Sequence, residues 1–495
     1  MSGIDLNEEE RRLFDLLRSV ARGLGDKQVE VRCAGGWVRD KLLGRGSDDI
    51  DIALDTMSGE EFANHLNEYL TSHGEQRANV AVIRSNPDQS KHLETAKVKY
   101  QGIEIDFVNL RSESYASTSR IPEIEFGTAE EDAVRRDFTI NALFYNIGQG
   151  NVEDLTGKGL EDLRNKLIRT PLPALQTFTD DPLRVLRAVR FSSRLNFDLH
   201  EELVEAASSS EVKAALQTKV SRERISTEFE AMMEGPDPKL ALKLIRSFGL
   251  LDVILDIPEK MKGELPPGYA EPCISCGILM AHLLAGEGNK STKRIGILSA
   301  LLLPLRDFWT EGEKKNKRMC LPEHVVSVSL KKKKVSNLVG CLQKGAGDIL
   351  SVSGDIRDTS SISQETKVKL GMAIKSTKEL WKLAIMVSYV MGLPCGRSLG
   401  KEDKSPAVAC GDSDGSLEKS LTYATKVEEV AVSLKIDKAW QMKPLVNGKD
   451  LINLLNAKGP VIGKAVQEMT KWQLAHPDGS AEDCKEYLLG IRGTL

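Results

Sequence analysis

The sequence predicts an α+β protein in which a mixed α/β unit is followed by helical domains. Two observations predict this class. Strand-like segments are concentrated in the first ~145 residues, and helical periodicity dominates after about residue 160. The length is a third constraint, because 495 residues at ~100–200 per domain indicate three or four domains. A single small binding module is therefore excluded.

The N-terminal unit alternates expected helices and strands. A helix is predicted over 7–23, where apolar residues follow an acidic first turn at helical spacing. The segment 29–36 alternates like a strand and ends in a glycine pair. The other expected strands cover 49–54, 79–84, 96–100 and 103–110, and further helices cover 37–43 and 58–73.

The remainder of the chain is expected to be helical. Segments of helical periodicity are separated there by Pro, Gly or Ser, which end helices. Two stretches rich in Gly, Pro and polar residues, 257–270 and 394–418, are the expected linkers or long loops. The clearest expected helices cover 182–195, 201–216, 222–234 and 238–249.

Composition favours a soluble globular protein, with 41% hydrophobic and 28% charged residues. No run reaches the ~18 apolar residues of a membrane span, so no membrane partner is expected. Eight scattered cysteines and the lack of an apolar signal peptide predict a reducing, intracellular compartment. Cys273 and Cys276, the one close pair, are expected to be buried thiols and not half of a zinc site. The net charge of −4 does not indicate a nucleic-acid binder, although such signals are local.

A glycine pair joins the first expected strand to the following helix. Gly35 and Gly36 leave backbone N–H groups free to cradle phosphate oxygens, although such a pair is also common in plain tight turns. Asp49 and Asp51 follow on the next strand, where residues i and i+2 share a face. Two like charges repel unless a cation lies between them, and oxygen ligands select Mg²⁺. The alternative is an exposed acidic strand.

This order of a glycine pair, a short helix and Asp-x-Asp resembles the DNA polymerase β-like nucleotidyltransferases. The resemblance implies phosphoryl transfer with two metal ions. Such sites usually recruit a third carboxylate from a neighbouring strand. Asp106 is the candidate, because alternation places it on the polar face of 103–110. It could equally be a solvated strand residue.

A second polar string covers 130–143. Arg135 and Arg136 offer bidentate donors to phosphate, and Asp137 and Asn141 can accept hydrogen bonds from ribose hydroxyls. The alternative is a surface cluster of salt bridges.

The segment 180–191 combines an aspartate with arginines at every third position. A carboxylate only accepts hydrogen bonds and a guanidinium only donates them, so Asp181 and Arg184 complement an amine beside a ring nitrogen. Cytosine and adenine present that pair, whereas uracil and guanine would leave buried polar groups unpaired. The pair would therefore accept CTP and ATP, leaving Arg187 and Arg190 for phosphates. An ion pair between Asp181 and Arg184 on a solvated face is the alternative.

Together these strings resemble class II CCA-adding tRNA nucleotidyltransferases, with a dense match from 32 to about 234. The resemblance implies a catalytic head at 1–150, a helical neck at 151–240, a body at 241–395 and a tail at 396–495. Body and tail would hold the tRNA acceptor stem and elbow. The implied catalytic residues are Asp49, Asp51 and Asp106, with Mg²⁺ at Asp49 and Asp51. The implied nucleotide contacts are Gly35, Gly36, Arg39, Arg136, Asp137, Asp181, Arg184, Arg187 and Arg190.

Basic clusters in the middle of the chain are candidate RNA contacts. Residues 301–350 hold ten Lys or Arg against five Asp or Glu. Phosphate contacts would give salt-dependent, sequence-independent RNA binding. A solvated helix face, a loop or a localisation signal are the alternatives. The candidates are Lys314, Lys315, Lys317, Arg318, Lys331, Lys332, Lys333 and Lys334.

The function that this resemblance implies is template-independent addition and repair of the CCA end of tRNA from CTP and ATP. A poly(A) polymerase with the same head, or an inactive RNA-binding protein on the same fold, are the alternatives. We expect a monomer in the cytoplasm or nucleus, with a mitochondrial pool if an alternative start adds a targeting segment.

Overall fold

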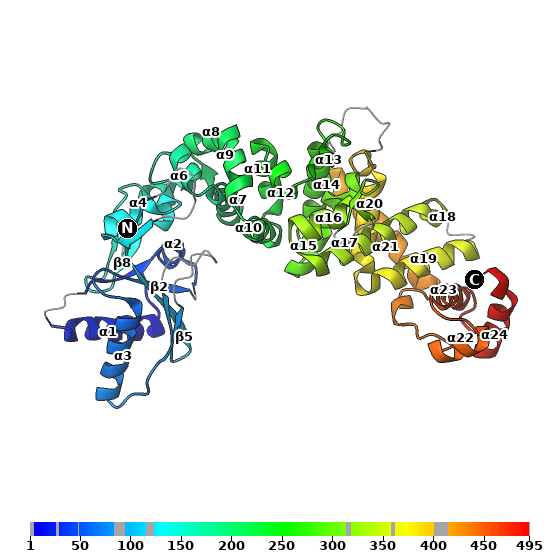
Figure 1. Ribbon diagram of the computed structural model, residues 1–495, viewed down its shortest axis with the longest axis horizontal. Helices are drawn as coiled ribbons and strands as arrows, with labels where there is room; N and C mark the ends of the chain where they lie inside the picture. The colour runs from blue at the N-terminus through cyan, green and yellow to red at the C-terminus, as the bar shows by residue number, and fades with distance from the viewer. Residues whose placement is uncertain are drawn as a thin grey trace. The chain divides into compact units, whose positions relative to one another are not determined.

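The structure is a computed structural model, shown in Figure 1, in which the described residues fall into two compact units, Met1–Arg224 and Ile225–Leu495. It describes residues 4–25, 29–47, 49–83, 95–114, 123–312, 318–357, 362–399 and 414–494. The finer division into head, neck, body and tail stays a prediction.

A seven-stranded mixed sheet lies at the centre of the first unit, in the order β3-β4-β5-β2-β1-β8-β9. The pair β2–β5 is parallel, and the other neighbours are antiparallel. All five strands expected from alternation are confirmed, and their observed ends differ from the expected ends by no more than two residues. The strands are β1 (Val31–Ala34), β2 (Ile50–Leu54), β3 (Asn79–Ile83), β4 (Thr95–Tyr100), β5 (Ile103–Asn109), β8 (Phe144–Asn146) and β9 (Asn151–Glu153).

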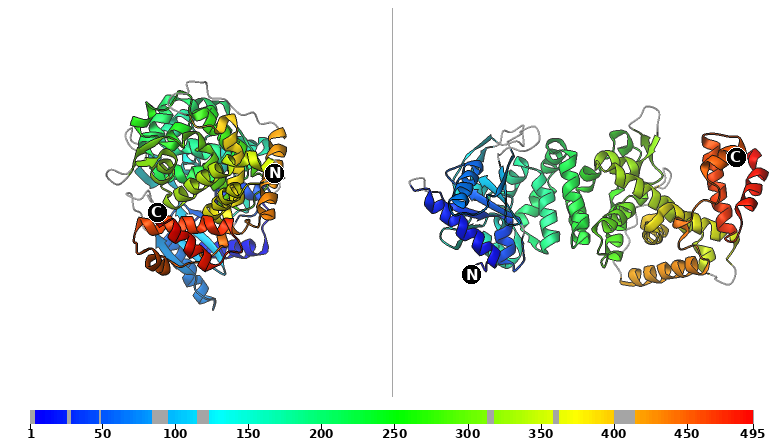
Figure 2. Two further views of the ribbon diagram at one scale, coloured as in Figure 1. Left: turned by 90° about the vertical axis from the view of Figure 1, so that its right-hand side faces the viewer. Right: turned by 90° about the horizontal axis from the view of Figure 1, so that it is seen from below.

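Helices α1 (Glu8–Gly23) and α3 (Gly59–Ser72) contact each other and the sheet, as Figures 1 and 2 show. Helix α1 begins with a capping box between Asn7 and Glu10, which satisfies two backbone N–H groups. The Phe14 ring lies 5.3 Å from Trp37 of α2 (Gly36–Leu42) and 5.7 Å from Tyr145 of β8. This aromatic cluster fixes the first helix against the turn that carries the glycine pair.

Short elements complete the first unit. Sequence analysis missed the β6–β7 hairpin and the strands β8 and β9, because each has only three or four residues. The remaining elements are β6 (Arg111–Ser114), β7 (Glu123–Phe126), α4 (Ala129–Arg135), η2 (Thr139–Asn141), α5 (Gly159–Asn165), β10 (Leu167–Ile168), α6 (Ala174–Asp180), α7 (Leu183–Leu195), β11 (Asp198–Leu199), α8 (Glu201–Ser208) and α9 (Ser210–Lys219).

The prediction of a single helix over 201–216 is wrong, because the helix is interrupted at Ser209 and forms the two helices α8 and α9. This residue has extended backbone angles, φ −67° and ψ 146°, and its hydroxyl accepts a hydrogen bond from the backbone N–H of Val212. Serine caps a helix in this way, since its side chain replaces the missing backbone acceptor. The apolar spacing continues through the break, so periodicity alone did not reveal it.

The second unit is helical apart from a short hairpin, β12 (Trp309–Glu311) with β13 (Arg318–Cys320), which was not expected. Cys273 and Cys276 are buried free thiols on α14, as predicted. No helix among the described residues is long and apolar enough to cross a membrane. The helical elements are α10 (Arg222–Glu234), α11 (Pro238–Phe248), α12 (Leu251–Leu255), α13 (Glu259–Lys262), α14 (Ala270–Leu283), α15 (Lys290–Leu301), η3 (Leu303–Leu305), α16 (Leu321–His324), η4 (Val325–Ser329), α17 (Lys333–Ser351), α18 (Ser353–Arg357), α19 (Gln364–Thr377), η5 (Lys378–Leu380), α20 (Trp381–Gly392), η6 (Pro394–Gly396), α21 (Asp414–Ser433), η7 (Ala439–Gln441), α22 (Gly448–Leu455), α23 (Pro460–Ala475), α24 (Ala481–Gly490) and η8 (Arg492–Thr494).

The two expected linkers differ. The stretch 257–270 contains the single-turn helix α13. The stretch 394–418 contains η6 and the beginning of α21, and its residues 400–413 lie outside the described residues.

Candidate active site

Two carboxylates meet at the only parallel strand pair of the described sheet. Asp51 of β2 and Asp106 of β5 are register partners. Partners on neighbouring strands lie on the same face, so the two side chains are adjacent. Asp49 lies one residue before β2, at the spacing that places it beside Asp51. The expected position of Asp106, on a neighbouring strand beside Asp51, is confirmed, whereas its catalytic role stays a prediction.

The positive side chains near these carboxylates do not fully balance their negative charge. Desolvation raises the pKa of Asp51, and the charges of Asp106 and Asp49 raise it further against the opposing effect of Arg136. Lys97 of β4 lies opposite Asp106, and its Nζ is 2.9 Å from the Asp106 carboxylate. Lys97 and Arg136 therefore face three carboxylates, and the remaining negative charge suits a cation.

The donor chemistry fits a magnesium ion. Among the described residues, no three His, Cys, Asp or Glu side chains form a complete metal cage. Magnesium does not need such a cage, because it is usually bound by one or two carboxylates together with waters and substrate phosphates. Asp49 and Asp51 are the residues that would hold it.

The glycine turn lies next to these strands. Gly35 adopts φ +68°, a left-handed conformation that side chains rarely take, and its N–H donates to the carbonyl of Leu143 at 3.0 Å. A Cβ atom at Gly35 would lie 2.8 Å from Nη1 of Arg136. Gly36 begins α2, whose N-terminus has no side-chain cap. The pair thus makes a tight turn and brings the backbone close to an arginine.

Arg39 is anchored inside the first unit. It is only 3% exposed, its Nε donates to Asp40 at 2.8 Å, and its Nη1 donates to Oδ1 of Asn141 at 2.5 Å. Burial lowers its pKa, although Asp40 partly opposes this effect. In this arrangement Arg39 fixes the helix that follows the glycine turn.

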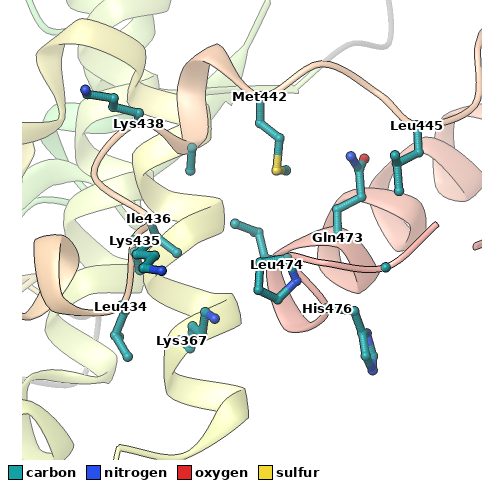
Figure 3. A pocket seen from close by; sticks show the side chains of 13 residues that line it. Lys367, Leu434, Lys435, Ile436, Lys438, Met442, Leu445, Gln473, Leu474 and His476 are labelled. Carbon is teal, nitrogen blue, oxygen red and sulfur yellow. The ribbon is translucent and has the colours of Figure 1, made fainter. Parts of the chain in front are cut away.

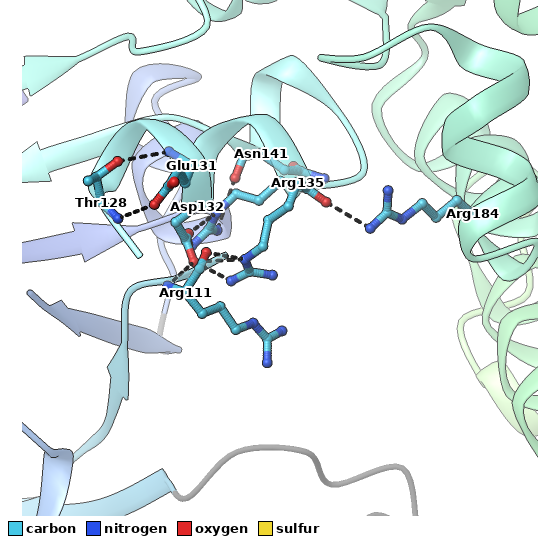
Figure 4. A network of polar contacts seen from close by, with 8 residues as sticks. Arg111, Thr128, Glu131, Asp132, Arg135, Asn141 and Arg184 are labelled. Carbon is cyan, nitrogen blue, oxygen red and sulfur yellow. Dashed lines mark hydrogen bonds and ion pairs between the residues drawn. The ribbon is translucent and has the colours of Figure 1, made fainter. Parts of the chain in front are cut away.

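Asp132 forms ion pairs with both arginines of the second polar string. Figure 4 shows its contact with Arg135. Its Oδ1 accepts from Nε of Arg135 at 3.0 Å, and its Oδ2 accepts from Nε of Arg136 at 2.9 Å. Burial alone would raise the pKa of Asp132, but the two guanidinium groups outweigh it and the pKa is lowered. The salt-bridge alternative is thus part of the structure, and it aims Arg136 at the glycine turn.

Asp137 is also held inside the protein. Its Oδ1 accepts from Nδ2 of Asn141 at 3.0 Å, and its Oδ2 accepts from Nε of Arg187 at 2.7 Å. Burial would raise the pKa of Asp137, but Arg187, Asn141 and Arg184 outweigh it and the pKa is lowered. Ribose recognition by Asp137 and Asn141 stays a prediction, because both already bind protein groups here.

The predicted base-reading pair is not an ion pair. Asp181 accepts from Nη2 of Arg224 at 3.0 Å and from the backbone N–H of Leu183 at 3.2 Å. Arg184 instead donates to the carbonyl oxygen of Arg135 at 2.7 Å (Figure 4). The two side chains are therefore oriented by different neighbours. Arg184 contacts the second polar string, and Asp181 contacts the first residue of α7.

Three arginines gather around one aromatic ring. The guanidinium carbons of Arg39, Arg187 and Arg190 lie 5.1, 5.5 and 4.6 Å from the centroid of Phe191. Cations at this distance are attracted by the ring face. Phe191 thus brings Arg39 of α2 together with Arg187 and Arg190 of α7.

Sequence reasoning missed four residues of this region. Asp132 had a visible signal, since it precedes Arg135 and Arg136 at helical i+3 and i+4 spacing. Arg224 pairs with a residue 43 positions away, and such a pairing has no local signal. The others are Lys97 and Phe191.

The predicted RNA contacts are only partly described. Lys314, Lys315 and Lys317 lie outside the described residues, and Arg318 is exposed on β13. Lys331, Lys332, Lys333 and Lys334 line a pocket of about 580 Å³ before and within the first turn of α17. Lys332 is bound to Glu230 at 2.7 Å, so its charge is already paired. RNA binding by these residues stays a prediction.

The mixed sheet, the Asp51–Asp106 strand pair and the glycine turn define a nucleotidyltransferase head. Two family models match the chain. The Poly A polymerase head domain matches residues 31–169, and the probable RNA and SrmB-binding site of polymerase A matches 196–261.

The relatives specify the family. The mitochondrial CCA tRNA nucleotidyltransferase of Candida glabrata is 34% identical, and the match covers 99% of this chain and 96% of the relative. The corresponding protein of Saccharomyces cerevisiae is 36% identical over 94% of this chain and 88% of its own length. The chain belongs to the CCA tRNA nucleotidyltransferases.

The fold agrees with this assignment. The crystal structure of a Bacillus stearothermophilus CCA-adding enzyme in complex with CTP matches with a TM-score of 0.59 and 21% identity, covering 99% of both chains. At this identity the match supports the fold, and it extends over both compact units.

Proposed function

We propose that this protein adds and repairs the 3′-terminal CCA of tRNA, taking C from CTP and A from ATP and releasing pyrophosphate. One observation carries the proposal: Asp51 and Asp106 are register partners beside the Gly35 turn, in a chain related to CCA tRNA nucleotidyltransferases over nearly its full length. The terminal 3′ hydroxyl of the tRNA attacks the α-phosphate, and pyrophosphate leaves.

Asp49 and Asp51 would hold Mg²⁺, which when bound activates the hydroxyl and neutralises the triphosphate. Asp106 adds a third carboxylate next to Asp51, and Lys97 limits the repulsion among them. Gly35 and Gly36 allow the backbone to approach the phosphates, because no side chain stands in the way.

Base selection would rest on Asp181 and Arg184. Arg224 and the backbone N–H of Leu183 fix the Asp181 carboxylate, and each of its oxygens keeps a second lone pair for a base amine. Arg184 supplies donors to the neighbouring ring nitrogen. Uracil or guanine would face Asp181 with a carbonyl oxygen, which repels a carboxylate.

The proposed compartments include mitochondria, because both yeast relatives described above are named as mitochondrial enzymes. Activity in the cytoplasm or nucleus and a monomeric state are further parts of the proposal. The cytoplasmic or nuclear part is supported by the reducing environment that the cysteine pattern predicts and by the tRNA substrate.

The test uses tRNA transcripts that end before CCA, after the first C and after CC, each incubated with one nucleoside triphosphate. We expect CMP incorporation from CTP into the first two and AMP incorporation from ATP into the third. Long A-tails made without CTP would indicate a poly(A) polymerase. Binding without incorporation would indicate an inactive RNA-binding protein. Either result would overturn the proposal.

A further inference from the structure

A pocket in the second unit lies between helices far from the nucleotidyltransferase motifs in the sequence. It is formed by α19, the segment after α21, η7 and the end of α23, as Figure 3 shows. Its volume is about 270 Å³, and its apolar lining includes Ile436, Met442 and Leu474. Pockets for whole small molecules usually measure ~300–1,000 Å³, so this one suits a single ring.

Three lysines surround this apolar lining. Lys367, Lys435 and Lys438 contribute to the pocket wall, and no Asp or Glu does so. Lys435 and Lys438 are exposed, and Lys367 is half-buried. None of the three ammonium groups forms an ion pair with a carboxylate in the described part of the chain. The pocket therefore combines an apolar interior with uncompensated positive charge.

A flat ring is already fixed at the pocket wall. The His476 imidazole stacks on Trp472 at 4.7 Å with an angle of 25° between the rings, and its Nδ1 lies 3.0 Å from the carbonyl oxygen of Trp472. Gly479 permits this stack, because a Cβ atom there would lie 2.4 Å from Trp472. The His476 ring is therefore held in one orientation by Trp472.

We propose that this pocket holds one unpaired nucleotide of the RNA substrate, an inference that rests on the proposed function. Single-stranded RNA is bound by ring stacking together with positive charge along the backbone. Every base in a strand has a phosphate on each side, which matches lysines placed around an apolar pocket. The base would lie against Leu474 and His476, and Lys367, Lys435 and Lys438 would contact the flanking phosphates.

The first experiment measures affinity for a tRNA transcript lacking CCA by fluorescence anisotropy at several KCl concentrations. We expect the triple variant K367Q/K435Q/K438Q to bind at least about fivefold more weakly. Its slope of log Kd against log salt should fall by about 2, since each single-strand phosphate contributes ~0.7. H476A should weaken binding without changing the slope, because it removes stacking and no charge.

The control variant is K449Q/K458Q/K464Q, which removes three exposed lysines that do not line the pocket. It loses the same total charge, so an equal effect of both triple variants would overturn the proposal. Circular dichroism melting checks that the variants fold.

The second experiment identifies the ligand. A transcript carrying 4-thiouridine is irradiated with the protein, and crosslinked peptides are mapped by mass spectrometry. A crosslink to the peptide containing His476 is expected, and its absence from every labelled position would overturn the proposal. If free AMP or CMP at millimolar concentration suppresses the crosslink to His476, the pocket is reassigned to a soluble nucleotide. If a polyglutamate peptide suppresses the crosslink and unlabelled RNA does not, the pocket is reassigned to an acidic protein partner.

Direct binding also separates this inference from the proposed function. If the wild-type protein incorporates no nucleotide while the pocket variants still lose RNA affinity, the function fails and the pocket assignment stands. If incorporation occurs and both triple variants bind RNA equally, only the pocket assignment fails.

Discussion

Arg187 donates from Nε to Oδ2 of Asp137 at 2.7 Å, and its Nη2 lies 2.6 Å from the same oxygen in an ion pair. This contact ties helix α7, which carries Arg184 of the proposed base-reading pair, to the segment in front of η2. Asn141 extends the contact, because it bonds both Asp137 and Arg39. Helices α2 and α7 are therefore joined by one polar network.

Replacing Asp137 should change both stability and its pH dependence. Asp137→Asn weakens a charged hydrogen bond to Arg187, so we expect the free energy of unfolding at pH 7 to fall by about 2 kcal/mol. The pKa of Asp137 is lowered in the folded protein, so its stabilisation is present above the unfolded pKa of ~3.9 and is lost as pH falls through the folded pKa. Urea unfolding from pH 7 to pH 3 should show the difference between variant and wild type shrinking below about pH 4. The exposed Asp198→Asn serves as the control, and an equal effect of the two substitutions at pH 7 would contradict the prediction.

Asp51→Asn should abolish activity without destabilising the head. Loss of the proposed metal ligand would remove several kcal/mol of transition-state stabilisation, so CMP incorporation should fall by at least about 10³-fold. The melting temperature should stay the same or rise, because the substitution removes like-charge repulsion with Asp106. Glu104→Gln is the matched control, since Glu104 lies on the neighbouring strand β5 but pairs with Lys99 at 3.3 Å. Single-turnover incorporation and thermal melting together check this prediction, which is wrong if Asp51→Asn retains wild-type rates.

Asp181→Ala should relax nucleotide choice. The variant lacks the acceptor proposed to repel uracil, so the ratio of kcat/KM for CTP to that for UTP should fall at least about tenfold. Competing incorporation from mixed CTP and UTP into a tRNA lacking CCA measures this ratio. Asp180→Ala, one residue earlier, should keep the wild-type ratio. An unchanged ratio in Asp181→Ala would remove the base-reading role from this residue.

Ser209→Ala should destabilise the start of α9. The hydroxyl of Ser209 caps the Val212 N–H, and loss of such a cap costs about 1 kcal/mol. Hydrogen exchange should show faster exchange at Val212, and chemical unfolding should show the stability loss. Ser210→Ala is the control, because Ser210 stands inside the helix one position later. Equal stability of the two variants would argue against the cap.

The sequence predicted those parts of the site that follow from local spacing. A strand period of two placed Asp49, Asp51 and Asp106 on polar faces, and the structure pairs Asp51 with Asp106 as expected. The glycine turn was predicted for the same reason, since Gly35 lies at a strand–helix junction and takes a positive φ.

Pairings between distant segments could not be predicted from spacing. Nothing near Asp181 indicates that Arg224 binds it, or that Arg184 bonds the carbonyl of Arg135. The break at Ser209 was hidden for a different reason, because apolar residues keep helical spacing on both sides of it. Side-chain pairing and capping are set by three-dimensional context, which a single sequence does not encode locally.

The division of the chain at Arg224 has an evolutionary consequence. Every residue assigned to metal, triphosphate or base lies before this boundary, whereas every lysine proposed to touch RNA lies after it. Substitutions in the second unit can therefore alter which RNAs are held, and how tightly, without disturbing the chemistry. Such a chain can follow changes in its tRNA repertoire while its reaction stays constant.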